Sequence, residues 1–121
     1  MIIETAKVSY DIEIEYSFSG AESEDTLLFV HGLGSNLRQF EMQQQYFAKN
    51  YRILLISLQG HGNSSIPINP TLNGYTIREM TRDVQALLTH LGINKVHFVG
   101  NSMGGLVGYE LLEWMRGCFH H

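Results

Sequence analysis

The chain has 121 residues, of which 44% are hydrophobic and 17% charged, and its formal net charge is −4. This length and composition predict one domain with a hydrophobic core and argue against a disordered chain. The lack of a basic cluster argues against a protein that binds nucleic acid, and no apolar run approaches the length of a membrane span. Cys118 is the only cysteine, which rules out an internal disulfide and favours a cytoplasmic location.

The N-terminal segment begins with an alternating pattern. In VSYDIEIEYSF, residues 8–18, apolar and polar side chains alternate strictly. This pattern predicts antiparallel strand with one wet face, either as one long strand or as a hairpin that turns near Asp11. TLLFV, residues 26–30, is apolar throughout, as expected for a strand covered on both faces of a parallel sheet. It runs directly into a glycine-rich turn, His31-Gly32-Leu33-Gly34.

The middle of the chain continues with a helix, a strand and a loop. Ser35 or Asn36 is a candidate cap for the first helix. RILLI, residues 52–56, predicts another strand that is buried on both faces. The segment IPINPTLNG, residues 66–74, contains both prolines and predicts a loop.

A well-defined helix follows this loop. Thr76 and Glu79 form a capping box, in which each side chain can satisfy the backbone amide of the other residue. Gly92 is a natural end for the helix. Between them lies an apolar stripe at helical spacing, formed by Ile77, Met80, Val84, Leu87, Leu88 and Leu91.

The last part of the chain contains one more strand and one more helix. KVHFV, residues 95–99, predicts a third buried strand, and residues 103–115 are apolar on most sides, which suits a buried helix. The order is therefore an antiparallel start followed by strand and helix three times. This order predicts an α/β fold with parallel strands and helices on both faces of the sheet.

The turn between the last strand and the last helix carries the pattern glycine–any–serine–any–glycine, in Gly100, Ser102 and Gly104. Small residues on both sides of a serine permit a sharp turn that presents the hydroxyl above the sheet. The amide of Met103, at the helix N-terminus, would point toward a developing oxyanion. The amide of Leu33, in the first glycine-rich turn, is the candidate for a second donor.

Three motifs appear in order after the alternating strand: HGLGSN at 31–36, QGHGNS at 59–64 and GNSMGG at 100–105. Together they resemble the α/β-hydrolase fold, and most closely its serine-hydrolase members. The resemblance covers the chain up to Trp114. One departure is Ser57-Leu58-Gln59, where the family commonly has aspartate-x-arginine; it puts the stability of this turn in question more than the chemistry.

The resemblance implies a serine nucleophile, a later Asp or Glu, and a histidine near the end of the domain. Carried over by position, the nucleophile is Ser102 and the oxyanion hole is formed by the amides of Leu33 and Met103. The motif residues that support this assignment are His31, Gly32, Gly34, Gly100 and Gly104. The family domain is much longer. Residues 1–121 are therefore expected to be the N-terminal portion of a single domain, without the acid, the histidine and the lid.

The residues after Ser102 do not complete the triad. The later candidates are Glu110, Glu113, His120 and His121. A helix rises about 1.5 Å per residue, so its far end lies roughly 18 Å from the serine, whereas hydrogen-bond reach is about 3 Å. His31 and His61 lie on turns at the same sheet edge, and we expect them to tie neighbouring loops together. No pair of histidines has the spacing of a metal site.

The sequence therefore predicts a serine hydrolase that acts on small esters, lactones or thioesters, without a cofactor or a metal. The serine excludes dehalogenase-type members, which use an aspartate nucleophile, and the chain alone is expected to be inactive or very weak. Asn101 before the serine also resembles members that hydrolyse carbon–carbon bonds in vinylogous diketones. A further alternative is a truncated, non-catalytic remnant or binding module. The KVHFV strand is expected to form an open edge that invites self-association.

Overall fold

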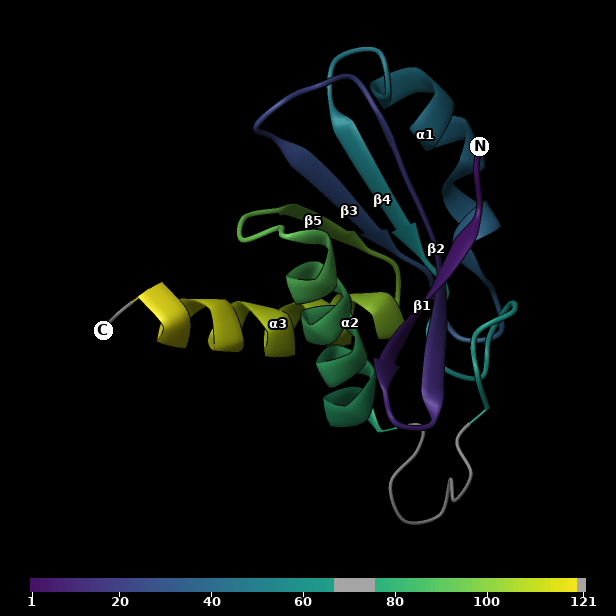
Figure 1. The fold of residues 1–121 in the computed structure, drawn as a ribbon, viewed down its shortest axis with the longest axis vertical. Coiled ribbons are helices and arrows are strands. Elements are labelled where there is room, and N and C mark those ends of the chain that lie inside the picture. Colours follow the sequence, from purple (N-terminus) through teal and green to yellow (C-terminus); the bar gives the residue numbers. More distant parts are fainter. Residues whose placement is uncertain (67–75, 120–121) are drawn as a thin grey trace.

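The structure is a computed structural model that describes residues 1–66 and 76–119, with side chains up to residue 115 (Figure 1). Within these ranges, the strands form one mixed sheet in the order β1-β2-β4-β3-β5. Their bounds are Glu4–Ser9 for β1, Ile12–Gly20 for β2, Thr26–Val30 for β3, Arg52–Ile56 for β4 and His97–Gly100 for β5. The loop predicted for residues 66–74 lies outside the described residues from position 67 onward.

The alternating N-terminal segment is a hairpin. β1 and β2 pair antiparallel and turn at Tyr10 and Asp11, as one of the two predicted forms required. The prediction of a wet face is wrong in the middle of β2, because Glu15 and Ser17 are buried. The segment after β4 covers this face: Ser57 bonds to the Glu15 carboxylate. Alternation indicates which side chains share a face, but it does not show what the rest of the chain lays over that face.

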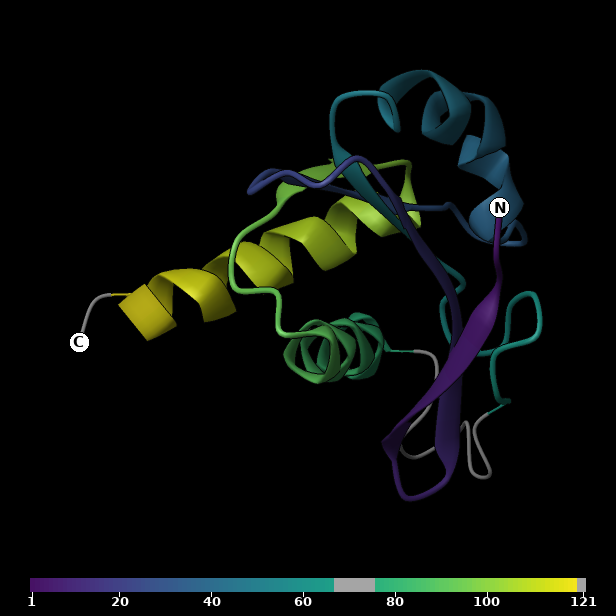
Figure 2. The same cartoon turned by 45° about the horizontal axis from the view of Figure 1, so that its top comes forward.

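Helices cover both faces of the sheet, as predicted. The 3-10 helix η1, Leu37–Phe40, and the helix α1, Glu41–Phe47, lie on one face, while α2, Ile77–Leu91, and α3, Met103–Phe119, lie on the other (Figure 2). Each face has its own apolar core. Phe29, Ile53 and Leu55 point toward η1 and α1, whereas Leu28 and Leu54 point toward α2 and α3. The continuous apolar runs of β3 and β4 supply both cores.

The predicted N-cap and the predicted end of α2 are confirmed, although among the described residues the Glu79 carboxylate bonds to Arg82 and not to the Thr76 amide. The Thr76 hydroxyl accepts a hydrogen bond of 3.0 Å from the Glu79 amide, and Gly92 closes the helix with a left-handed backbone at φ 71°. The stripe residues Met80, Val84, Leu87 and Leu88 are buried against the sheet. The predicted cap of the first helix is Asn36, whose side chain accepts from the Arg38 amide.

β5 and α3 are less buried than their sequences indicate. β5 lies at the edge of the sheet and pairs only with β3, so Val99 is 42% exposed. On α3, Val107 and Leu111 are buried, but an apolar face remains exposed, formed by Leu106, Tyr109, Leu112 and Trp114. The predictions of a doubly buried strand and a buried helix are therefore wrong. β5 has a neighbouring strand on one side only, and no described element covers the exposed face of α3. In the described ranges, no helix has the length and apolarity to cross a membrane.

The topology brings two glycine-rich turns to the same place. β5 and β4 pair with opposite sides of β3, and the chain leaves β3 toward α1 but leaves β5 toward α3 on the other face (Figure 1). Where connections diverge in this way, a crevice forms at the carboxyl ends of the strands. The turns after β3 and β5 meet at this edge of the sheet, where Gly32 lies beside Asn101 and Ser102.

Candidate active site

The serine of the third turn has a strained backbone. Ser102 lies between β5 and α3 with φ 55°, and it is the one non-glycine residue with a positive φ in the described part of the chain. Left-handed backbone costs an L-residue about 1–2 kcal/mol. Such strain marks sharp strand-to-helix turns that present a nucleophilic hydroxyl. Ser102 is exposed to solvent.

The flanking glycines allow this turn to be tight. A Cβ atom on Gly100 would lie 2.6 Å from the carbonyl of Gly104. A Cβ atom on Gly104 would collide with the Val30 carbonyl oxygen at the end of β3. The Asn101 amide also donates a hydrogen bond of 3.1 Å to the Val30 carbonyl. The turn thus packs backbone against backbone on β3, which only glycines permit.

The turn after β3 lies beside the serine. A Cβ atom on Gly32 would lie 3.5 Å from the Cβ of Ser102 and 3.2 Å from the Asn101 carbonyl oxygen. Met103 begins α3, so its amide has no acceptor within the helix. Among the described residues, no acceptor takes the Leu33 amide either. Two backbone donors are therefore left for a ligand at the crevice.

His31 is a buried structural residue. Its Nδ1 donates a hydrogen bond of 2.7 Å to the Gly32 carbonyl, and its Nε2 accepts one of 2.9 Å from the Leu58 amide. Its side chain has no exposed surface, and burial lowers the pKa of His31 below its ordinary value. A neutral imidazole thus ties the turns after β3 and β4 together, as the sequence predicted.

His61 connects the same two turns. Its Nδ1 donates a hydrogen bond of 3.0 Å to the Gln59 carbonyl, and its Nε2 accepts one of 3.0 Å from the Gly34 amide. Its ring lies 4.9 Å from that of His31, measured between centroids. Both nitrogens of both rings are engaged, so neither histidine is available as a base in this arrangement.

Comparison with known proteins identifies the family. The sequence profile of the alpha/beta hydrolase fold matches residues 25–113. The chain belongs to this family. Its hydrolase-fold relatives include 3-oxoadipate enol-lactonase 2 of Acinetobacter baylyi, which is 39% identical over 105 residues, covering 87% of this chain and 36% of the relative. The fluoroacetate dehalogenase of a Burkholderia species is 33% identical over 86 residues, covering 70% of this chain and 28% of the relative.

The solved structures are hydrolases of the same fold. A hydrolase from Pseudomonas aeruginosa superposes with a TM-score of 0.79 at 30% sequence identity, covering 90% of this chain and 40% of that protein. The chain spans about a third of the length of the curated relatives that it matches. The part that the family profile matches, residues 25–113, contains β3 to β5, the three glycine-rich turns and most of α3.

Sequence reasoning missed a buried carboxylate beneath the second turn of this hydrolase fold. The Glu15 side chain accepts hydrogen bonds from the Ser57 hydroxyl at 2.8 Å and from the Asn63 side-chain amide at 2.8 Å. The Ser57 hydroxyl in turn accepts one of 3.1 Å from the Leu37 amide. Glu15 occupies a polar position of the alternating strand, so its pattern indicated a solvated side chain. The sequence signal for this contact was Ser57, which occupies a position where the family commonly has aspartate.

The other unusual residue of that turn also bonds to a buried carboxylate. The side-chain amide of Gln59 donates a hydrogen bond of 3.1 Å to Asp83 on α2. Burial, and then the negative charge of Glu79, raise the pKa of Asp83 to about 7. Neutral side chains at positions 57 and 59 thus join this turn to β2 and α2 through carboxylates.

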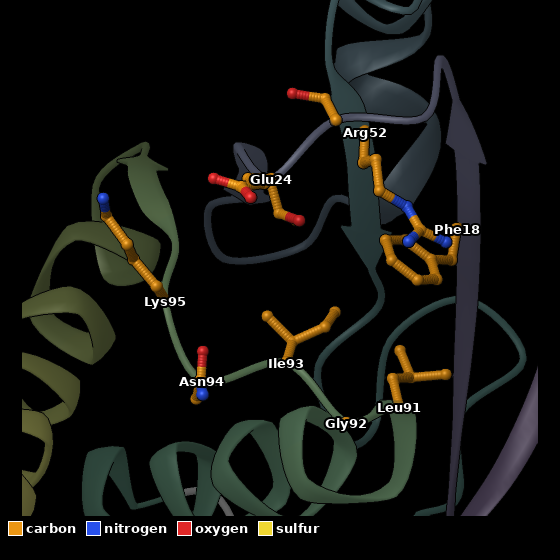
Figure 3. Close-up of a pocket in the computed structure, with 10 residues that line it drawn as sticks. Phe18, Glu24, Arg52, Leu91, Gly92, Ile93, Asn94 and Lys95 are labelled. Carbon is orange, nitrogen blue, oxygen red and sulfur yellow. The ribbon is translucent and has the colours of Figure 1, made fainter.

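A separate hollow lies at the opposite end of the parallel strands (Figure 3). Its volume is about 150 Å³, and the segment after α2 forms one side of it, including Gly92 and Lys95. The Arg52 guanidinium lies over the Phe18 ring, 4.4 Å from the centroid. Because Arg52 begins β4 and Ser102 follows the carboxyl end of β5, this hollow is not part of the candidate active site.

The described residues hold no cluster of three or more histidine, cysteine, aspartate or glutamate side chains that could bind a metal ion. At the carboxyl edge of the sheet, the two turns present the Ser102 hydroxyl and the backbone amides of Leu33 and Met103. Such a set can attack an electrophilic carbon and stabilise a negative oxygen beside it.

Proposed function

We propose that residues 1–121 form the N-terminal portion of a single α/β-hydrolase domain and carry the nucleophile of a serine hydrolase, Ser102. The observation that carries this proposal is the left-handed backbone of Ser102 at the carboxyl end of β5. Strain of this kind persists where the surrounding structure holds it and where it serves a function. Here the surrounding structure is the glycine contact with β3.

The proposed reaction is acyl transfer to water. The Ser102 oxygen attacks the carbonyl carbon of an ester, a lactone or a thioester, and the carbonyl electrons move to the carbonyl oxygen. The amides of Leu33 and Met103 donate hydrogen bonds to this oxyanion, and the positive end of α3 adds favourable potential. The tetrahedral intermediate then expels the alcohol or thiol, which takes a proton. Water attacks the acyl-enzyme in the same way, releases the acid and returns the proton to Ser102.

The base that accepts the serine proton is proposed to lie outside the described residues. His31 and His61 each engage both ring nitrogens with the backbone. The resemblance implies a later acid and a later histidine. The longer relatives have room for both, and we propose that the corresponding part of the domain supplies them, together with the lid.

The substrate class follows from the nucleophile and from the relatives. A serine hydroxyl forms an acyl-enzyme, whereas dehalogenase-type members of the family are expected to use an aspartate. A relative at 39% identity is named an enol-lactonase, which supports small esters and lactones as the substrates of this chain.

We also propose that the chain self-associates through β5. This strand lies at the sheet edge, and its residues His97, Val99 and Gly100 are exposed. The exposed apolar face of α3 lies on the same side of the molecule (Figure 1). A second copy would pair with the free edge and cover these side chains.

The proposed nucleophile is tested with a fluorophosphonate probe. The chain is assayed alone and also extended from Glu113 by the corresponding C-terminal part of the enol-lactonase relative. Probe labelling and ester hydrolysis are measured for wild type, for Ser102→Ala and for the control Ser23→Ala, which changes a serine at the far end of the sheet. We expect labelling of the extended protein that Ser102→Ala abolishes and Ser23→Ala retains. Equal labelling of all three, or none in the extended wild type, would overturn the proposal.

A further inference from the structure

The proposed oxyanion donor lies in a turn with a defined backbone. The Ser35 amide donates a hydrogen bond of 3.2 Å to the Gly32 carbonyl, so residues 32–35 form a β-turn with Leu33 and Gly34 at its centre. Gly34 has φ 81°, which corresponds to a type II turn. Types I and II differ by a flip of the central peptide, and a glycine at this position permits both. The turn therefore needs an external contact to fix the peptide between Leu33 and Gly34.

His31 fixes the first peptide of the turn. Its Nδ1 donates to the Gly32 carbonyl at 2.7 Å, and the ring is buried and held at Nε2 by the Leu58 amide. In a planar trans peptide, the carbonyl and the following N–H point in opposite directions. By holding the Gly32 carbonyl on the protein side, His31 directs the Leu33 amide away from the interior, toward the crevice.

His61 fixes the second peptide of the turn. The Gly34 amide donates to its Nε2 at 3.0 Å, while its Nδ1 donates to the Gln59 carbonyl. These two contacts require the neutral tautomer with the proton on Nδ1. The side chain is 9% exposed, so water does not easily replace either contact. A flip to the type I turn would turn the Gly34 amide away from His61 and leave that nitrogen without its donor.

We propose that His61 is a positioning residue for the oxyanion hole. In its Nδ1-protonated neutral form it holds the Leu33–Gly34 peptide in the type II orientation, and with His31 it fixes the two consecutive peptides that aim the Leu33 amide at the crevice beside Ser102. The importance of this amide rests on the proposed function. The hydrogen bond from the Gly34 amide to His61, which we call the latch, is a contact within the described residues. Its presence can be measured without any assay of catalysis.

The test uses nuclear magnetic resonance on the ¹⁵N-labelled chain. In wild type, the ring nitrogens of His61 are assigned, and the amide hydrogen exchange of Leu33 and Gly34 is measured. The same amides are measured in His61→Leu, which removes both contacts, and in His61→Gln, whose amide group can donate at one atom and accept at the other. The control is His90→Gln, which changes an exposed histidine on α2.

The wild-type ring is expected to carry its proton on Nδ1. In His61→Leu, exchange of the Gly34 amide should rise about tenfold, as for the loss of one hydrogen bond, and the Leu33 amide signal should shift. His61→Gln should restore both signals, and His90→Gln should leave them unchanged. A proton on Nε2 in wild type, or the same Gly34 exchange in a folded His61→Leu, would overturn the proposal. If His61→Leu does not fold, the wild-type tautomer and the His61→Gln exchange decide.

The outcomes separate this inference from the proposed function. If Ser102 proves unreactive while Gly34 exchange depends on residue 61, the latch exists and the hydrolase assignment fails. If Ser102 reacts but Gly34 exchange does not depend on residue 61, the assignment stands and the latch is wrong.

Discussion

The Gln59 side-chain amide donates a hydrogen bond of 3.1 Å to the Asp83 carboxylate, and both side chains are buried. The partner of this buried carboxylate is thus a neutral amide, whereas a buried charged carboxylate is usually paired with a cation. Burial and the charge of Glu79 raise the pKa of Asp83 to about 7. Since the unfolded chain has the ordinary, lower pKa, the folded state binds the extra proton between these two values.

The stability of the chain is accordingly expected to fall as pH rises. Because the folded pKa is the higher one, the proton stabilises the fold fully near pH 4, and this contribution is lost as pH rises through about 7. The free energy of unfolding should fall by about 2–4 kcal/mol over this window. Urea titrations from pH 4 to 8 measure this change. Asp83→Asn should flatten the dependence, and an unchanged slope in that variant would assign the dependence to another group.

At the serine turn, alanine substitutions of two neighbouring glycines are expected to change the free energy of unfolding in opposite directions. Gly104→Ala places a methyl group against the Val30 carbonyl oxygen, and the free energy of unfolding should fall by about 3 kcal/mol. The neighbouring Gly105→Ala meets its nearest atom only at 4.0 Å. Because alanine favours helix, this control should gain up to about 1 kcal/mol. Chemical denaturation measures both, and equal effects would show that the two glycines have the same environment.

The Ser17 hydroxyl is buried with no hydrogen-bond partner in the part of the chain that the structure describes. Ser17→Ala removes an unsatisfied polar group and should raise the free energy of unfolding by about 1 kcal/mol. The matched control is Ser19→Ala on the same face of β2, since Ser19 accepts a hydrogen bond of 2.9 Å from Gln44. This control should lose about 1 kcal/mol. A loss of stability in Ser17→Ala would contradict the unpartnered state of its hydroxyl.

The exposed edge of the sheet predicts the behaviour of the chain in solution. Light scattering over a concentration series should show an average mass above that of one chain. Val99→Lys adds a charge to β5 and Leu112→Lys adds one to the apolar face of α3, and each should shift the chain toward the monomer. A wild type that stays monomeric at high concentration and unfolds cooperatively would refute self-association.

Local sequence signals predicted the elements that depend on local chemistry. The Thr76 cap and the Gly92 end of α2 follow from backbone hydrogen bonds and turn conformation within a few residues. The hairpin at Asp11 is one of the two forms that the alternating pattern left open. The three glycine-rich turns were found in sequence, and their meeting at one sheet edge follows from strand order. The roles of Ser102 and Leu33 in chemistry stay predictions.

Burial was harder to predict, since it depends on what packs against an element. Glu15 alternates like a solvated residue, yet the Ser57 turn folds over it. β5 carries the apolar Phe98 and Val99 of the predicted strand but has only one described neighbour in the sheet. The cytoplasmic location inferred from the single Cys118 also stays a prediction, because it concerns the cell rather than the fold.

The left-handed backbone of Ser102 has a consequence for how this sequence can change over time. Glycine would relieve the strain at residue 102 by about 1–2 kcal/mol. A lineage selected only for a stable fold would therefore tend to replace this serine with glycine. Keeping serine at this position therefore lowers the tolerance to further mutations, and retains the hydroxyl that we propose as the nucleophile.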